Sequence, residues 1–145
     1  MNQPSPSVTI KKADWQRDQQ QIIDIRTQVF VQEQGVPTDI ELDGQDPQCH
    51  HLLAYLGDQP IGTVRLLPDG RIGRLAVVME QRHRGSGGEL LREIIRVAHA
   101  AGMESLYLHA QVQTLDFYRR LGFIADGEEF VEAGIRHRNM TLPAP

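Results

Sequence analysis

The sequence lacks several features that define large classes of protein. It has one cysteine, Cys49, among its 145 residues, which excludes an intrachain disulfide framework and a cysteine-rich zinc site. No apolar run approaches the roughly 18–20 residues that a membrane-spanning helix needs. Residues 1–7 (MNQPSPS) do not show the charged and then apolar segments of a signal peptide. We therefore expect a cytoplasmic protein that has no membrane partner.

An excess of positive charge is also absent. Fifteen basic residues stand against nineteen acidic ones, which gives a formal net charge of -4, whereas domains that bind a nucleic-acid backbone usually carry a basic excess. The six histidines show no HExxH or other metal-ligand spacing. We therefore expect neither a nucleic-acid partner nor a bound metal.

The length fits one domain, since domains typically hold roughly 100–150 residues. Residues 1–7 contain two prolines and two serines and are expected to form a flexible leader. Residues 8–142 would then form the domain, and residues 143–145 would be a short tail.

Hydrophobic periodicity predicts elements in the order β-α-β-β-β-α-β-α-β-β. Asp14 can cap a helix in which Ile22, Ile25, Val29 and Phe30 recur at spacings of three and four. The acidic segment 37–48 is expected to be a loop. The expected strands are 8–12, 51–55, 61–67, 71–78, 105–110, 123–130 and 135–142, and the expected helices are 15–33, 87–101 and 114–121. This order predicts a single α/β (α+β) domain with a mixed, largely antiparallel sheet and helices on both faces.

A glycine-rich turn lies between the expected strand 71–78 and the helix that follows. It reads RHRGSGGELL over residues 82–91. Glycines let the backbone approach a ligand closely, and the first N–H groups of a helix are free donors at the positive end of its dipole. The segment matches neither a P-loop nor the dinucleotide fingerprint GxGxxG. It therefore predicts an anion-binding turn, with a plain glycine-rich turn flanked by solvated arginines as the alternative.

Two motifs in this sequence resemble those of the GNAT superfamily of N-acetyltransferases. Arg82-x-x-Gly85-x-Gly87 is similar to the family's acetyl-CoA pyrophosphate-binding signature. The segment LDFYRRLGF (115–123) resembles the family's late motif, a short helix that ends in Gly-Phe and carries a tyrosine four residues before the glycine. The resemblance covers roughly residues 8–142, and the first half looks like a small bacterial branch of uncharacterised substrate.

The resemblance implies acetyl-CoA as cosubstrate and assigns residues to it. The strand residues Leu75, Ala76 and Val77 would accompany the pantetheine arm. Gln111 stands where many members carry an asparagine, and we expect it to contribute similar hydrogen bonds. The residues expected to hold the pyrophosphate are Arg82, Arg84, Gly85, Ser86, Gly87 and Gly88.

Tyr118 matches the tyrosine that protonates the departing CoA thiolate in many members. A phenol of reference pKa about 10 stays protonated at neutral pH and can donate to a thiolate of reference pKa near 8.5. Without the resemblance, the plain interpretation is a buried aromatic residue whose hydroxyl finds a partner.

The acceptor side is less defined by the sequence. Glu41 and Asp43 are our candidates for the base that deprotonates the amine, or for binding its ammonium group; a solvated acidic loop is the alternative. Phe30 and Glu33 are expected in the acceptor pocket. Arg26 and Arg65 lie within apolar elements, and either bind a substrate carboxylate there or pair with the acidic segment 37–48.

The reaction implied is transfer of an acetyl group from acetyl-CoA to a primary amine by direct attack through a tetrahedral intermediate. The partner would be a small-molecule amine or a peptide amine, and a homodimer is left open. An acyltransferase similar to acyl-homoserine-lactone synthases, which share this overall fold, is one alternative. A non-catalytic CoA-binding module is the other.

Overall fold

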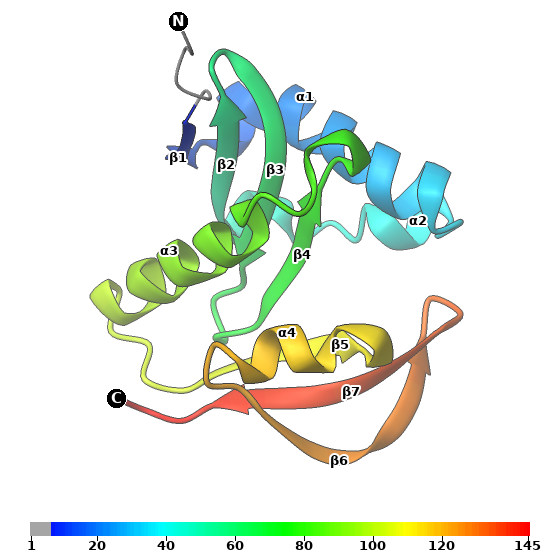
Figure 1. Ribbon diagram of the computed structural model, residues 1–145, viewed down its shortest axis with the longest axis vertical. Coiled ribbons are helices and arrows are strands. Elements are labelled where there is room, and N and C mark those ends of the chain that lie inside the picture. Colours follow the sequence, from blue (N-terminus) through cyan, green and yellow to red (C-terminus); the bar gives the residue numbers. More distant parts are fainter. Residues whose placement is uncertain (1–6) are drawn as a thin grey trace, which may run out of the picture.

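Two antiparallel sheets make up the framework of the computed structural model, which describes residues 7–145 (Figure 1). Six residues of the expected leader lie outside the described part. The first sheet has the order β1-β2-β3-β4, with bounds Val8–Ala13, His50–Leu56, Gln59–Leu66 and Ile72–Val77. The second has the order β5-β7-β6, with bounds Leu106–Gln111, Ile135–Leu142 and Ile124–Glu132.

The two sheets meet where β4 and β5 begin. A parallel bridge joins Arg71 to Tyr107, and the Tyr107 N–H donates to the Gly70 carbonyl at 3.2 Å. Beyond this point the strands belong to separate sheets, and Figure 1 shows them diverging. The expected mixed sheet is therefore two antiparallel sheets that share one parallel contact.

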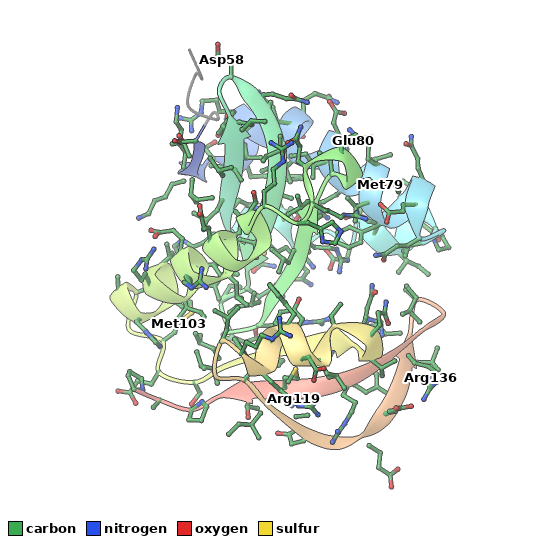
Figure 2. The ribbon with its side chains drawn as sticks, viewed as in Figure 1. Asp58, Met79, Glu80, Met103, Arg119 and Arg136 are labelled. Carbon is green, nitrogen blue, oxygen red and sulfur yellow. The ribbon has the colours of Figure 1, made fainter. Side chains whose placement is uncertain are left out.

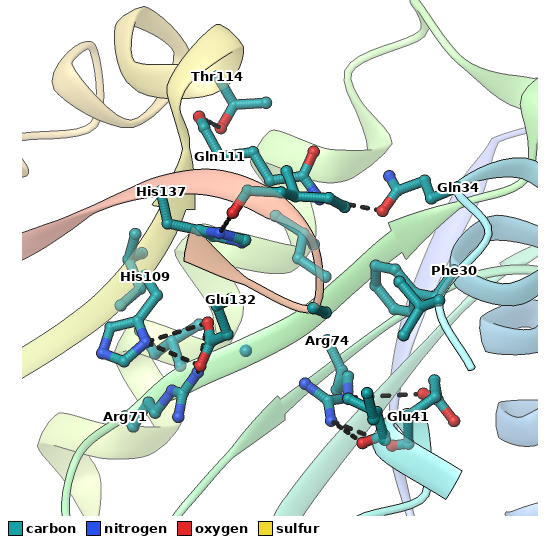
Figure 3. Close-up of a pocket in the computed structure, with 18 of the residues that line it drawn as sticks. Phe30, Gln34, Glu41, Arg71, Arg74, His109, Gln111, Thr114, Glu132 and His137 are labelled. Carbon is teal, nitrogen blue, oxygen red and sulfur yellow. Dashed lines mark hydrogen bonds and ion pairs between the residues drawn. The ribbon is translucent and has the colours of Figure 1, made fainter. Parts of the chain in front are cut away.

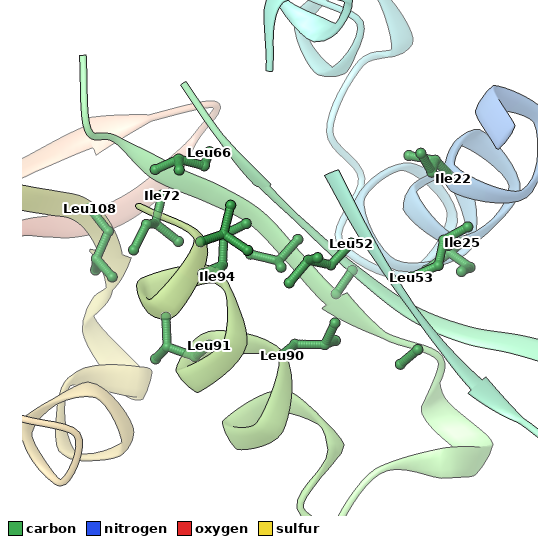
Figure 4. Close-up of a cluster of buried hydrophobic side chains, with 14 of the residues drawn as sticks. Ile22, Ile25, Leu52, Leu53, Leu66, Ile72, Leu90, Leu91, Ile94 and Leu108 are labelled. Atoms are coloured by element: carbon green, nitrogen blue, oxygen red, sulfur yellow. The ribbon is translucent and has the colours of Figure 1, made fainter. Parts of the chain in front are cut away.

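Helices cover both faces of the first sheet. Helix α1 (Trp15–Arg26) packs Ile22 and Ile25 onto one face, whereas α3 (Ser86–Ala100) packs Leu90 and Ile94 onto the other (Figure 4). These side chains are almost fully buried, as their helical spacing predicts. The expected cap is also present, because the Asp14 side chain accepts from the Arg17 N–H at 3.0 Å.

Shorter elements connect these layers. The π-helix η1 (Thr27–Glu33) continues α1, and α4 (Leu115–Arg119) lies on the second sheet near β5 and β6. The remaining short elements are α2 (Thr38–Glu41) and the 3₁₀ turns η2 (Asp46–Gln48), η3 (Met79–Gln81) and η4 (Val112–Thr114).

The predicted elements agree with the structure to within two residues at each end, apart from two segments. The helix expected over 15–33 has its predicted extent but changes to π-helical pitch after Arg26. Hydrophobic spacing does not distinguish the two pitches over so short a run. The segment 37–48, expected to be a loop, contains α2 and η2, because its side chains make tertiary contacts that sequence patterns do not show.

The point where the sheets meet requires a glycine at position 70. Gly70 has φ +93°, and a Cβ there would lie 2.5 Å from the Ser105 carbonyl oxygen. Gly57, at the tip of the β2–β3 hairpin beside Asp58 (Figure 2), has φ +59°, but a Cβ there would meet no atom within 4 Å. Both glycines have the left-handed backbone conformation, but only Gly70 has no space for a side chain.

We predict that Gly70→Ala destabilises the protein more than Gly57→Ala. The left-handed backbone costs roughly 1–2 kcal/mol in both variants, and the overlap with Ser105 adds roughly 1–3 kcal/mol in Gly70→Ala alone. Urea unfolding of the two variants measures the difference. Equal losses would contradict the close approach at this junction.

Candidate active site

A cavity of about 400 Å³ lies between the diverging strands β4 and β5 (Figure 3). Phe30 and Gln34 from the end of η1 lie on one side, and His109 and Glu132 of the second sheet lie on the other. Most of the remaining lining comes from strand β4, helix α4 and the segment 36–43. The cavity therefore collects side chains from both halves of the chain.

A bulge in β4 turns consecutive residues toward this cavity. In the pairing of β3 with β4, Thr63 opposes Ala76 and Arg65 opposes Gly73, so two β4 residues face one β3 residue. Arg74 has φ +49°, and both Arg74 and Leu75 line the cavity. Neighbouring strand residues normally point to opposite faces, but a bulge re-aims them and leaves part of the backbone unpaired.

Tyr118 of α4 lines the cavity, as the sequence predicts. Its ring packs against Phe117 and Phe123, with centroid distances of 4.9 Å and 6.0 Å. Burial raises the pKa of Tyr118 to about 12. Within residues 7–145 its hydroxyl makes no hydrogen bond by the usual geometric criteria. The phenol therefore stays protonated at neutral pH and has a proton to donate.

The glycine-rich turn forms a second cavity, of about 250 Å³, at the N-terminus of α3. Gly85 has φ +83° and precedes the helix. The first intrahelical bond runs from the Glu89 N–H to the Gly85 carbonyl at 3.1 Å, so the N–H groups of residues 86–88 precede it. The Ser86 Oγ is buried without a hydrogen-bond partner. The lining residues are Gly85, Gly88, Arg92, Phe117, Arg120 and Leu121.

This second cavity fits a phosphate-bearing ligand. Free backbone donors lie at the positive end of a 15-residue helix, whereas the sealed Ser86 hydroxyl does not line the cavity. Arg92 and Arg120 border the cavity. Sequence reasoning missed both arginines, although Arg92 lies one helical turn after Gly88 and that spacing places it on the same face.

Arg82 has a different role from the one expected. Its Nε donates to the Val77 carbonyl at 2.9 Å, and its two terminal nitrogens lie 2.6 Å from the Glu33 carboxylate. The hydrogen bond with Glu33 raises the pKa of Arg82 and lowers that of Glu33. Arg82 therefore fastens the turn to β4 and η1, and the exposed Arg84 is the free cation of the predicted pair.

Comparisons with known proteins agree with this geometry. The family model of the acetyltransferase (GNAT) domain matches residues 14–144. This chain belongs to the GNAT acetyltransferase family. An uncharacterised N-acetyltransferase of Bacillus subtilis strain 168, YjcF, is 33% identical over 120 residues, which are 80% of this chain and 86% of that protein.

Solved structures show the same GNAT fold. An acyl-CoA N-acyltransferase from Pseudomonas aeruginosa superposes with a TM-score of 0.83 at 30% identity, covering 94% of this chain and 99% of that one. Escherichia coli ElaA superposes with a TM-score of 0.84 at 25% identity and the same coverage. The predicted family and fold class are confirmed.

The structure of this GNAT domain answers the question that the sequence left open for Arg26 and Arg65. Both are buried, with 0% and 2% of their surfaces exposed, and neither lines the cavity. Arg26 lies 2.7 Å and Arg65 3.0 Å from the same oxygen of Asp46. The predicted substrate-binding role is wrong for both, because they pair with the acidic segment instead.

Glu41 and Asp43 belong to the same network. Arg26 donates to the Glu41 carboxylate, and Arg65 and Arg74 donate to Asp43 at 2.9 Å and 3.3 Å. Burial alone would raise the pKa of Asp43, but the hydrogen bonds and positive charges of these arginines hold it well below its usual range. Both carboxylates are therefore engaged by arginines within the protein.

The other predicted residues divide between the cavity and its surroundings. Phe30, Leu75 and Gln111 line the cavity, and the Gln111 Nε2 donates to the Gln34 Oε1 at 3.0 Å. Ala76 and Val77 lie on β4 next to it but do not line it. Among residues 7–145 there is no helix long and apolar enough to cross a membrane. The same residues contain no group of three or more acidic, histidine or cysteine side chains arranged to hold a metal ion.

Sequence reasoning missed the wall formed by the second sheet. His109, Glu132 and His137 line the cavity from β5, β6 and β7. The Glu132 carboxylate lies 3.2 Å from the His109 Nδ1 and 3.2 Å from the Arg71 guanidinium. These residues are scattered along the chain on three different strands, and the sequence signal that could have grouped them is alternation along each of the last three strands.

We predict that Asp46→Asn destabilises the protein strongly. Asp46 lies between two buried arginines, and removing one partner of a buried ion pair typically costs about 3–5 kcal/mol. Asp39→Asn is the matched control, because Asp39 is exposed in the same segment and surface substitutions usually change stability by less than about 0.5 kcal/mol. Chemical unfolding measures both. A small loss in Asp46→Asn would show that the network adds little to stability.

Proposed function

We propose that this chain is an acetyl-CoA-dependent N-acetyltransferase that moves an acetyl group to a primary amine. One observation carries the proposal. Helix α4 borders both cavities, because Phe117 lines the cavity at the N-terminus of α3 and its neighbour Tyr118 lines the cavity between β4 and β5. An extended ligand with a phosphate group at one end and a reactive group at the other matches this arrangement.

The residues that would hold acetyl-CoA come from three elements. The turn before α3 would bind the pyrophosphate through the N–H groups of residues 86–88. Arg92 and Arg120 add positive charge there. The bulged part of β4, at Arg74 and Leu75, leaves backbone groups free for the pantetheine arm.

When bound, acetyl-CoA would supply an activated acetyl group as a thioester. A neutral amine nitrogen in the larger cavity attacks the carbonyl carbon directly, so no acyl-enzyme forms. Tyr118 donates its hydroxyl proton to the leaving sulfur, and its pKa of about 12 keeps this proton in place at every pH at which the enzyme would work. Cys49 takes no part, because burial raises the pKa of its thiol to about 11.

Two measurements test the proposal as a whole. Thermal unfolding in the presence of acetyl-CoA should shift to higher temperature, and adenosine monophosphate should give a much smaller shift. Thiol release from acetyl-CoA, followed across a panel of primary amines, should identify accepted acceptors. No stabilisation by acetyl-CoA would refute cosubstrate binding. Stabilisation without thiol release would favour a CoA-binding module.

We predict that Arg92→Ala weakens CoA binding by roughly 10- to 100-fold, because a hydrogen bond to a charged group contributes about 1.5–3 kcal/mol. Arg96→Ala is the matched control, since Arg96 lies one turn further along α3 and pairs with Glu93 at 2.6 Å, outside the lining of the small cavity. Isothermal titration with CoA measures both affinities. Equal CoA affinities of the two variants would show that Arg92 does not contribute to CoA binding.

We predict that Tyr118→Phe lowers kcat by roughly 10²- to 10⁴-fold, the range of general acid catalysis. CoA affinity should stay close to that of the unmodified protein, because Phe keeps the ring contacts with Phe117 and Phe123. Steady-state kinetics with an accepted amine and CoA titration separate the two effects. Unchanged kcat would show that Tyr118 is not the acid.

A further inference from the structure

We propose that His137 is the proton acceptor that converts the acceptor ammonium into the attacking amine. This inference rests on the proposed function and deepens it. His137 lies on β7, directly opposite Gln111 of β5 and Phe130 of β6 in the strand register. It lines the cavity between the two sheets, and Figure 3 shows its ring beside Gln111 on the wall formed by the second sheet.

The hydrogen bonding of His137 defines which nitrogen is free. Its Nδ1 lies 2.7 Å from the carbonyl oxygen of Ile135. A carbonyl only accepts hydrogen bonds, so Nδ1 carries the hydrogen and a neutral ring has its lone pair on Nε2. A stacking contact with Phe130, at a centroid distance of 5.9 Å and an interplanar angle of 18°, holds the ring in place.

His137 is buried, with 7% of its surface exposed, but its Nε2 keeps some contact with solvent. This nitrogen makes no hydrogen bond within residues 7–145, and it is not sealed from solvent as the unpartnered Nδ1 of His51 and Nε2 of His99 are. A lone pair that is fixed in direction, accessible and on a cavity wall is the arrangement a general base needs.

The other titratable groups of the cavity are already engaged. Glu41 and Asp43 pair with arginines. Arg71 and His109 both contact Glu132, and although burial alone would raise its pKa, these neighbours together with His137 hold it below its usual value. Figure 3 shows the His109 ring beside Glu132, with its Nδ1 directed at the carboxylate.

The charges around His137 come from every wall of the cavity. Glu132 on β6 is the acidic group of the wall formed by the second sheet. The remaining titratable groups of the lining are His109 on β5, Tyr118 on α4, Arg71 and Arg74 at β4, and Glu41 and Asp43 on the opposite wall.

The protons of the transfer then balance. One ammonium proton moves to the His137 Nε2, and the neutral nitrogen forms a bond with the thioester carbonyl carbon. The carbon–sulfur bond breaks, the sulfur takes the Tyr118 hydroxyl proton, and a second nitrogen proton returns to the Tyr118 oxygen. His137 releases its proton to solvent, so the products are an amide, a thiol and one proton.

The hydrogen-bonding state of His137 can be tested in the unliganded protein, by a measurement that does not depend on enzyme activity. Nitrogen-15 NMR of the histidine rings should show His137 with its hydrogen on Nδ1 at high pH, and with Nε2 taking up a proton as the pH falls. A ring with its hydrogen on Nε2 at high pH, or one that never takes up a second proton before the protein unfolds, would overturn the proposal.

The kinetics of the His137→Asn variant test whether His137 acts as the general base. The Asn side-chain amide can keep a donor near the Ile135 carbonyl, whereas it has no basic nitrogen. Ethylamine and methoxyamine are matched acceptors of nearly the same shape, and only ethylamine is protonated at neutral pH. We expect His137→Asn to lower kcat/KM for ethylamine by roughly 10²- to 10⁴-fold and to lower it far less for methoxyamine. His50→Gln, at an exposed position, should leave both unchanged.

The outcomes separate the two proposals. If the unmodified protein releases no thiol with any amine of the panel, the proposed function fails. If the protein is active and His137→Asn is equally active with ethylamine, or loses both acceptors equally while still binding CoA, the role of His137 as a base is overturned. Selective loss of ethylamine turnover supports it.

Discussion

The separation of β4 and β5 is the constraint on which the rest of the structure depends. The strands meet at one parallel bridge between Arg71 and Tyr107 and then continue in different sheets. A strand edge that has no neighbouring strand leaves backbone donors and acceptors without partners, and the bulge at Arg74 increases their number. The same divergence opens the cavity, because β4 and β5 belong to different sheets and no ladder of backbone hydrogen bonds holds them together beyond the bridge. A close approach at Gly70 sets where the divergence begins.

A buried ion-pair network supports one wall of that cavity. Arg26 and Arg65 share an oxygen of Asp46 and so connect α1, β3 and the segment after α2. Removing charges from water carries a large desolvation penalty, and such networks often add little net stability compared with apolar packing. Their geometry is nevertheless specific, because each buried charge requires its partner at hydrogen-bond distance. The network therefore places the end of η1, with Phe30, beside the cavity.

Different environments favour different protonation states for the polar groups of the cavity. Burial without a partner keeps the proton on Tyr118, whereas a carbonyl contact directs the free lone pair of His137 to Nε2. Acid and base roles are often separated in this way, by surroundings that favour opposite protonation states. Arg82, by contrast, pairs with Glu33 and so holds the glycine-rich turn to η1.

The sequence by itself determined the order of the elements, the glycine-rich turn before α3, the family and the position of Tyr118 next to Phe117. These features depend on short-range patterns: the period of apolar residues, glycines at a helix start, and a motif within nine residues. The tertiary structure alone decided which side chains meet. Arg26 pairs with residues 15 and 20 positions away, and the His109–Glu132–His137 wall depends on the register of three strands. Such contacts follow from how the sheets pack and from where buried charges find partners, and no local spacing specifies either.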